Sequence, residues 1–174
     1  SDKEKEKNFR KNYFEKSIYV FRISFVLVAL LYAAFGIFDP ITSPQNVKLF
    51  HFIRYAAVVP LLFLTFILSY SKIFEKIWQE LIFAGLTIGG IGIVIMLLKD
   101  PGNLLYYGGL FLVFMAGFFF IKLRFFYAMI AGVLILLIYN IGSLLFPFFS
   151  LYDNYLLIAN AFYVSAIIIS LFAL

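Results

Sequence analysis

Cysteine is absent from this sequence of 174 residues, and histidine occurs once, as His51. Without cysteine the chain has no disulfide framework, no thiol nucleophile and no thiolate metal site. A single histidine excludes a metal site with two histidine ligands and a bis-histidine haem. We therefore expect no metal and no cofactor in this chain, and we interpret His51 as an interfacial residue.

Charge is also scarce. Charged residues make up 13% of the chain, whereas 64% is hydrophobic and 21% aromatic, a balance that one soluble core of this size cannot hide. The apolar runs carry no lysine or acid near their middle, which argues against a retinal Schiff base and against a proton- or ion-coupled transporter. No nucleophile, base and orienting group lie close together in the sequence. The composition indicates an integral membrane protein, with the lipid bilayer as its partner, that is not itself catalytic.

The apolar run that sets the topology lies in residues 104–126, where eighteen uncharged residues are closed by Lys122 and Arg124. Eighteen residues at about 1.5 Å each just cross a hydrocarbon core of about 30 Å. The two cations mark the cytoplasmic end, and Tyr106 and Tyr107 mark the outer end, where their hydroxyls reach the headgroups. The chain is therefore expected to enter this span from outside.

Threading the chain from this direction predicts an all-α, polytopic membrane protein with a bundle of six transmembrane helices. The predicted spans are about 18–38, 49–70, 81–98, 104–121, 125–146 and 155–174, which together make a transmembrane domain over residues 18–174. Residues 1–17 mix both charge signs with three aromatics, which predicts a cytoplasmic amphipathic lead-in helix.

The basic residues support this topology. Ten of the fourteen Lys and Arg lie in three clusters on the predicted inner side, a pattern of cytoplasmic loops and not of a nucleic-acid-binding face. Residues 39–48, 99–103 and 148–154 are the predicted outer turns, and residues 71–80 form the longer inner connection. We expect a multi-pass protein of the cell (inner) membrane with both termini in the cytoplasm.

Arg22 and Arg54 are the only charges well inside apolar runs, where a cation costs roughly 2.5 kcal/mol or more at the centre and less near the ends. Arg22 lies close enough to the inner interface to snorkel. Arg54 lies one turn from the outer end, where it pairs with an acid of an outer loop or meets an anionic ligand; we favour the ion pair. The candidate ligand-binding residues at this outer mouth are Asp39, His51, Arg54, Asp100, Tyr106, Tyr107 and Asp153.

Small and polar residues inside the spans predict helix packing. Gly85 and Gly89 form a G-x-x-x-G spacing, which lets two helices approach closely within the bundle or, as the alternative, in a dimer contact. Asn140 and Asn160 are expected to form interhelical hydrogen bonds, worth around 0.6 kcal/mol each in lipid. Pro60, near the middle of the second span, is expected to kink that helix.

The last span ends in IIISLFAL without a basic or polar flank. We expect this chain to be a fragment whose parent continues into a cytoplasmic domain.

Several stretches share a pattern of helix ends and punctuation with a known family. They are EKSIYVFRISF, LLYAAFGIFD, HFIRYAAVVPLLFLTFILSYS, LYYGGLFLVFMAGFFFIKLRF and the asparagine of the last span. With them the chain resembles the six-span, receptor-like membrane region of bacterial class III adenylate/guanylate cyclases. The resemblance implies a homodimer, a helical transducer after Leu174, and cyclic-nucleotide synthesis in a domain beyond it. No catalytic residue of that domain carries over to this chain.

These observations lead to two functional hypotheses. The leading one is a membrane anchor and sensor of a nucleotide cyclase, which dimerises and responds to a lipid or small apolar ligand, because the predicted outer loops are too short for a folded extracellular sensor. The parent would make cAMP or cGMP, or would carry another output domain such as a diguanylate cyclase or kinase, and this fragment would not be an enzyme. The alternative is a complete small six-span transporter or channel, which the lack of charge in the middle of the spans disfavours.

Overall fold

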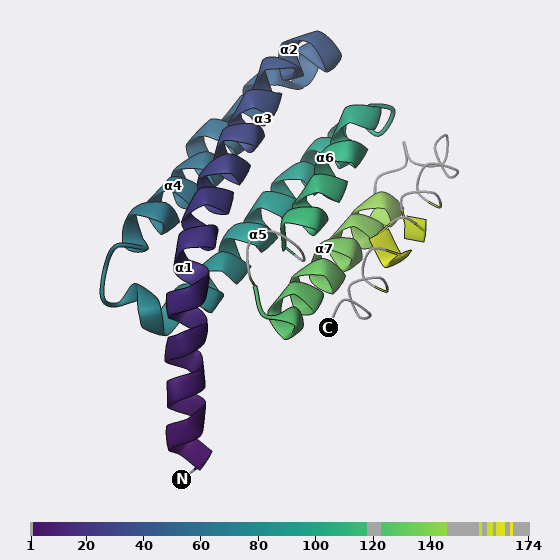
Figure 1. Cartoon of the computed structure of the whole chain (residues 1–174). Helices are drawn as coiled ribbons and strands as arrows, with labels where there is room; N and C mark the ends of the chain where they lie inside the picture. Colours follow the sequence, from purple (N-terminus) through teal and green to yellow (C-terminus); the bar gives the residue numbers. More distant parts are fainter. Residues whose placement is uncertain are drawn as a thin grey trace.

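The computed structural model describes residues 2–117 and 123–145, together with residues 157, 160–161, 163–165 and 168. This part of the chain is helical and contains no strand. Its elements are α1 (Asp2–Ala34), η1 (Phe35–Ile37), α2 (Asp39–Thr42), η2 (Pro44–Asn46), α3 (Val47–His51), η3 (Phe52–Val58), α4 (Val59–Leu68), α5 (Phe74–Lys99), α6 (Leu104–Met115) and α7 (Phe125–Leu145). The long helices run roughly side by side as one bundle (Figure 1).

Among the described residues, four helical stretches are long and apolar enough to cross a membrane: Asn12–Thr42, Pro44–Leu68, Phe74–Lys99 and Phe125–Leu145. They fall on the first, second, third and fifth predicted spans. The fourth predicted span contains α6, which is apolar but has only 12 residues. Residues 118–122 and most of the predicted sixth span lie outside the described residues.

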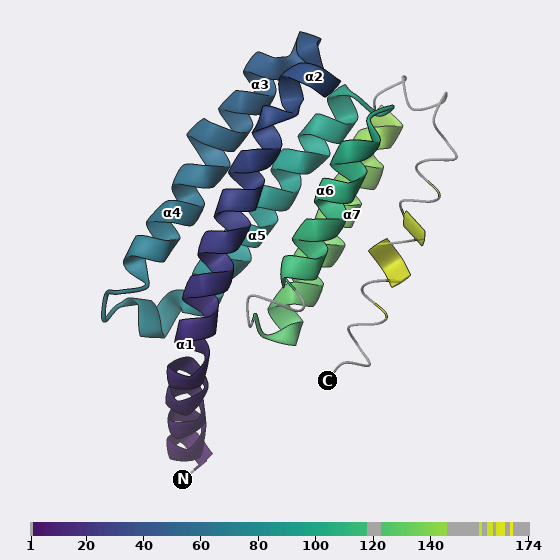
Figure 2. The same cartoon turned by 45° about the horizontal axis from the view of Figure 1, so that its top comes forward.

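α1 is one continuous helix of 33 residues, so the predicted lead-in and the first span are not separate elements. Its N-terminal turns extend past the other helices (Figure 2). Tyr13 and Phe14 nevertheless reach back to the bundle, with ring centroids 5.7 Å from Trp78 in each case. These aromatic contacts stabilise this part of α1 against the bundle, so the helix continues without a break.

The predicted inner connection at residues 71–80 is shorter than expected, because α5 begins at Phe74. The Phe74 side chain is completely buried and lies 5.3 Å from the ring of Phe21 on α1. Arg22 closes the same end of the bundle by donating from Nη2 to the Ser69 carbonyl oxygen at 2.6 Å. That carbonyl follows the last turn of α4, where backbone acceptors lack helical partners.

The predicted outer turn at residues 39–48 consists largely of short helices. It contains α2 and η2, and a proline lies in the first turn of each, where its missing N–H costs no helical hydrogen bond. Farther along the chain, the π-helix η3 ends two residues before Pro60. Proline lacks an N–H and clashes with the preceding turn, so a wider turn here accommodates it.

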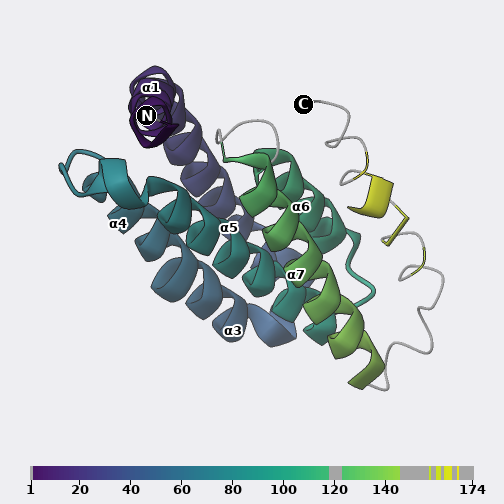
Figure 3. The same cartoon turned by 90° about the horizontal axis from the view of Figure 1, so that it is seen from below.

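α5 lies at the centre of the bundle and packs against α4, α6 and α7 (Figure 3). Its glycines make close approach possible on different sides. A Cβ atom on Gly90 would collide with the buried side chain of Ile135 on α7, whereas a Cβ atom on Gly89 would lie 3.7 Å from Val58, at ordinary contact distance. Helix packing through small residues is typical of membrane bundles.

These neighbouring glycines provide a matched test of the packing. We expect Gly90→Ala to lower the free energy of unfolding by about 1–3 kcal/mol, because the α5–α7 interface must move to admit a methyl group. Gly89→Ala should be neutral or stabilising by up to about 1 kcal/mol, because alanine favours the helix. Thermal unfolding in lipid would compare them, and equal effects of the two changes would contradict this packing.

Candidate functional site

A buried ion pair joins two neighbouring segments at the end of the bundle that contains α2 and the α5–α6 turn, here called the Asp39 end (residues 35–47 and 99–104). Arg54 Nε donates to Asp39 Oδ2 at 2.8 Å, and Arg54 Nη2 donates to Asp39 Oδ1 at 3.2 Å. The two side chains are 4% and 0% exposed. This two-bond geometry holds the guanidinium and carboxylate in a fixed relative orientation.

Two tyrosines complete the surroundings of the pair. Tyr106 of α6 donates its hydroxyl to Asp39 Oδ1 at 3.1 Å. Arg54 Nη1 donates to the Tyr32 carbonyl oxygen at 3.1 Å, and the guanidinium carbon lies 5.1 Å from the Tyr32 ring centroid. The pair thus connects α1, α2, η3 and α6, and the buried charges have the partners that an apolar interior requires.

Local backbone structure brings these groups together. Asp39 occupies the first turn of α2, and Arg54 lies in the π-helix η3. Gly36 lies beside Arg54 and Tyr55 of η3: an added Cβ atom would collide with the Tyr55 hydroxyl and approach Arg54 Cδ to 3.1 Å. Glycine at position 36 therefore allows the start of the second span to pass close to the end of the first.

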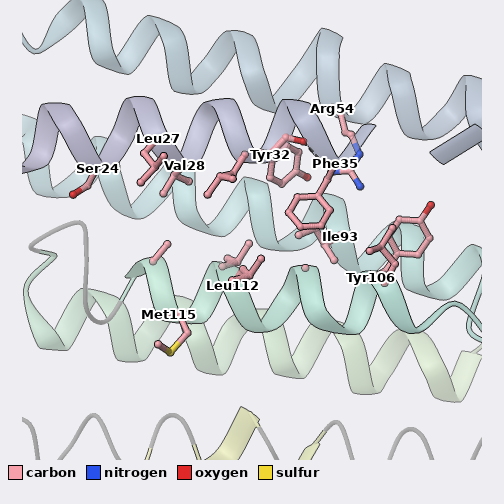
Figure 4. Close-up of a pocket in the computed structure, with 15 residues that line it drawn as sticks. Ser24, Leu27, Val28, Tyr32, Phe35, Arg54, Ile93, Tyr106, Leu112 and Met115 are labelled. Carbon is pink, nitrogen blue, oxygen red and sulfur yellow. Dashed lines mark hydrogen bonds between the residues drawn. The ribbon is translucent and has the colours of Figure 1, made fainter. Parts of the chain in front are cut away.

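A cavity of about 310 Å³ extends from this polar cluster between α1 and α6, with α5 behind it. Arg54, Tyr32, Phe35 and Tyr106 lie at one end, and Ser24 and Met115 lie toward the other (Figure 4). The side chains between these ends are almost all aliphatic. We call this cavity the α1–α6 groove; it is lined by Ser24, Leu27, Val28, Leu31, Tyr32, Phe35, Arg54, Ile93, Leu105, Tyr106, Gly109, Leu112, Val113, Met115 and Ala116.

The groove opens toward the apolar surface of the bundle. Leu27 and Leu31 on α1 are 54% and 46% exposed, and Leu112 on α6 is 46% exposed. These side chains form the edges of the groove and also belong to the face that a bilayer would cover. A molecule in the bilayer could therefore enter between α1 and α6 without passing through water.

The structure brings together only some of the predicted outer-mouth residues. Asp39, Arg54 and Tyr106 form the polar cluster, and the predicted pairing of Arg54 with an outer acid is seen in the Arg54–Asp39 contact. His51 lies beside them, with Nε2 3.0 Å from the Gly36 carbonyl oxygen. Asp39 is completely buried and is not exposed in a loop, because it forms the ion pair with Arg54.

The other predicted residues lie elsewhere. Asp100 Oδ2 accepts from Asn103 Nδ2 at 3.4 Å within the α5–α6 turn. Tyr107 donates to the Pro101 carbonyl oxygen at 3.2 Å and faces Tyr139 of α7, away from the groove. Asp153 lies outside the described residues.

The predicted packing residues lie inside the bundle. Gly85 faces Leu62 and Phe25, and the Gly89 carbonyl oxygen accepts a hydrogen bond from the Tyr32 hydroxyl at 3.2 Å. Asn140 and Asn160 donate to each other's amide oxygens at 2.9 and 2.8 Å, which is the interhelical contact expected for them.

Sequence reasoning missed the α1 wall of the groove. Its residues recur at positions 24, 27, 28, 31, 32 and 35, a spacing that places them on one face of a helix. Nothing in that apolar stripe distinguishes a groove wall from ordinary packing. Only the polar residues Ser24 and Tyr32 could have indicated that this face lines a cavity. Among the described residues, no group of three or more His, Cys, Asp or Glu could hold a metal ion.

Comparison with known proteins identifies a family that the chain matches. The model of a family described as MASE8, a membrane-associated sensory domain family, matches residues 37–174. This range contains the ion pair and the α6 wall of the groove, whereas all of α1 precedes it. No curated protein and no solved structure matches the chain.

The ion pair predicts a selective effect of removing one charge. We expect Asp39→Asn to lower the free energy of unfolding by about 3–5 kcal/mol, because it leaves the Arg54 cation buried without its counter-charge. Asp100→Asn is the matched control at the same end of the bundle, and its effect should stay below about 1 kcal/mol, because it removes no buried ion pair. Thermal unfolding in lipid measures both, and similar destabilisation by the two variants would contradict the assigned role of the pair.

Proposed function

This chain belongs to the MASE8 family of membrane-associated sensory domains, and from that membership we propose that it anchors and regulates a cytoplasmic nucleotide cyclase. The cyclase part of the proposal comes from the resemblance of the helix ends to the membrane region of class III cyclases. In this proposal the chain forms a homodimer, because class III catalytic sites form between two cyclase domains. The catalytic domain lies beyond residue 174, and this chain contributes no catalytic residue or cofactor.

The observation that carries the sensory role is the groove between α1 and α6. The connections at the Asp39 end are compact: α2 and η2 span residues 39–46, and only residues 100–103 separate α5 from α6. These two described connections are too short to form a folded domain that binds a signal outside the bilayer. A groove that opens on the apolar surface instead provides a route by which a signal reaches the bundle through the membrane.

α1 provides a path from the groove to the cytoplasmic side. It forms one wall of the groove with Leu27, Val28 and Leu31, and it continues without a break to its N-terminal turns beyond the bundle. A molecule that binds better when α1 and α6 are apart would favour that arrangement, and only such a difference in affinity can shift the output. The rigid helix would pass the displacement to the cytoplasmic domain.

Activity of the full-length parent tests this proposal. We expect deletion of residues 1–174 to change nucleotide cyclase activity in lipid vesicles while the cyclase domains remain dimeric, with oligomeric state measured by light scattering. If the full-length and truncated proteins are equally active and equally dimeric, this domain serves only as an anchor. If the parent carries no cyclase domain, the cyclase proposal is wrong and assays of transport follow.

A further inference from the structure

We infer that the α1–α6 groove binds a single-chain amphiphile whose head is an uncharged hydrogen-bond acceptor, such as an ester or a ketone. This inference deepens the proposed sensory function and rests on it, because it names the chemical class of the signal. Three properties of the groove support it: the apolar walls, the hydrogen-bond donors at the polar end, and the charge balance at that end.

The walls of the groove fit an aliphatic chain. Leucine, isoleucine, valine, methionine and alanine side chains form most of the lining, and the cavity of about 310 Å³ is at the small end of the usual range for ligand sites. Its length runs along the helices, from Arg54 near one end to Ser24 near the other (Figure 4). An apolar and elongated space of this size suits one acyl chain better than two.

The polar end offers hydrogen-bond donors. An arginine side chain has five N–H groups. Within the described part of the chain Arg54 makes three hydrogen bonds, two to Asp39 and one to the Tyr32 carbonyl oxygen, which leaves one N–H on each Nη atom without a partner there. Arg54 is 3% exposed and is one of the residues that line the groove, so its guanidinium is largely shielded from water at that end of the cavity. An acceptor oxygen on the amphiphile would satisfy these two N–H groups.

The charge balance selects an uncharged head. Asp39 already neutralises Arg54, with its carboxylate oxygens 2.8 and 3.2 Å from the guanidinium nitrogens. A carboxylate or phosphate bound to the remaining Arg54 N–H groups would place a second anion close to Asp39 in an apolar environment, where like charges repel strongly. An ester or ketone oxygen accepts the same hydrogen bonds without that cost.

Two adjacent glycines on α6 allow the groove to be filled selectively. Gly109 lines the groove, and an added Cβ atom would lie 3.5 Å from Ile93 Cδ1, so a larger side chain would extend into the cavity. Gly108 is next to it on the same helix, and an added Cβ atom there would meet nothing within 4 Å. Gly109→Leu and Gly108→Leu therefore make the same chemical change inside and outside the groove.

The experiment is photolabelling of this chain in phosphatidylcholine vesicles with a diazirine-bearing methyl ester of a medium-chain fatty acid. Mass spectrometry should locate the label on α1 and α6 residues that line the groove, and excess unlabelled ester should compete. We expect Gly109→Leu to reduce specific labelling about tenfold, a loss of about 1.4 kcal/mol of binding free energy, and Gly108→Leu to leave it unchanged. The free fatty acid of the same chain, at a pH where it is ionised, should label less.

Equal labelling of the two glycine variants would contradict binding in the groove, since the label would then report only ester dissolved in the lipid around the bundle. Stronger labelling by the ionised acid would overturn the uncharged head. Should Gly109→Leu unfold, Leu112→Trp blocks the edge of the groove, with Phe111→Trp as its control, because Phe111 is also partly exposed but does not line the cavity. Labelling needs no cytoplasmic domain, so failure here is distinct from failure of the cyclase assay.

Discussion

The buried pair between Asp39 and Arg54 is the interaction on which this structure depends. A cation one turn inside an apolar helix must find a counter-charge, and the chain supplies it from residue 39, at the start of the short helix α2. Several local features follow from that requirement. The α1–α3 connection folds into short helices, Gly36 lets the two segments approach, and Tyr106 extends the contact to α6.

The same pair explains how a groove can exist in a tightly packed bundle. α1 and α6 are tied together at the Asp39 end through Tyr32, Arg54, Asp39 and Tyr106. Below that connection they line opposite sides of the cavity, and α5 fills the space behind them. A sensory domain needs an element that can take two arrangements, and helices joined at one end and separated along their length provide one.

The sequence could predict four of the six expected spans and an acidic partner for Arg54, because apolar length and buried charge impose strong constraints. It could not predict where the helices begin. α5 starts at Phe74 and α1 continues from Asp2 because aromatic contacts between Phe14, Phe21, Phe74 and Trp78 form across the bundle. Nor could it predict the groove, since leucines that face lipid, a neighbouring helix or a cavity look alike. Tyr107 illustrates the same limit: it is adjacent to Tyr106, yet it faces α7.

The most direct test is the distance between α1 and α6, measured by pulsed electron paramagnetic resonance in lipid. The chain has no cysteine, so spin labels can be attached only at introduced sites. Leu30→Cys and Phe111→Cys place them on exposed positions outside the groove. If the Asp39–Arg54 pair sets the separation of these helices, the distance distribution is narrow in the otherwise native chain and broadens with Asp39→Asn but not with Asp100→Asn. An unchanged distribution in the Asp39→Asn protein would contradict this account.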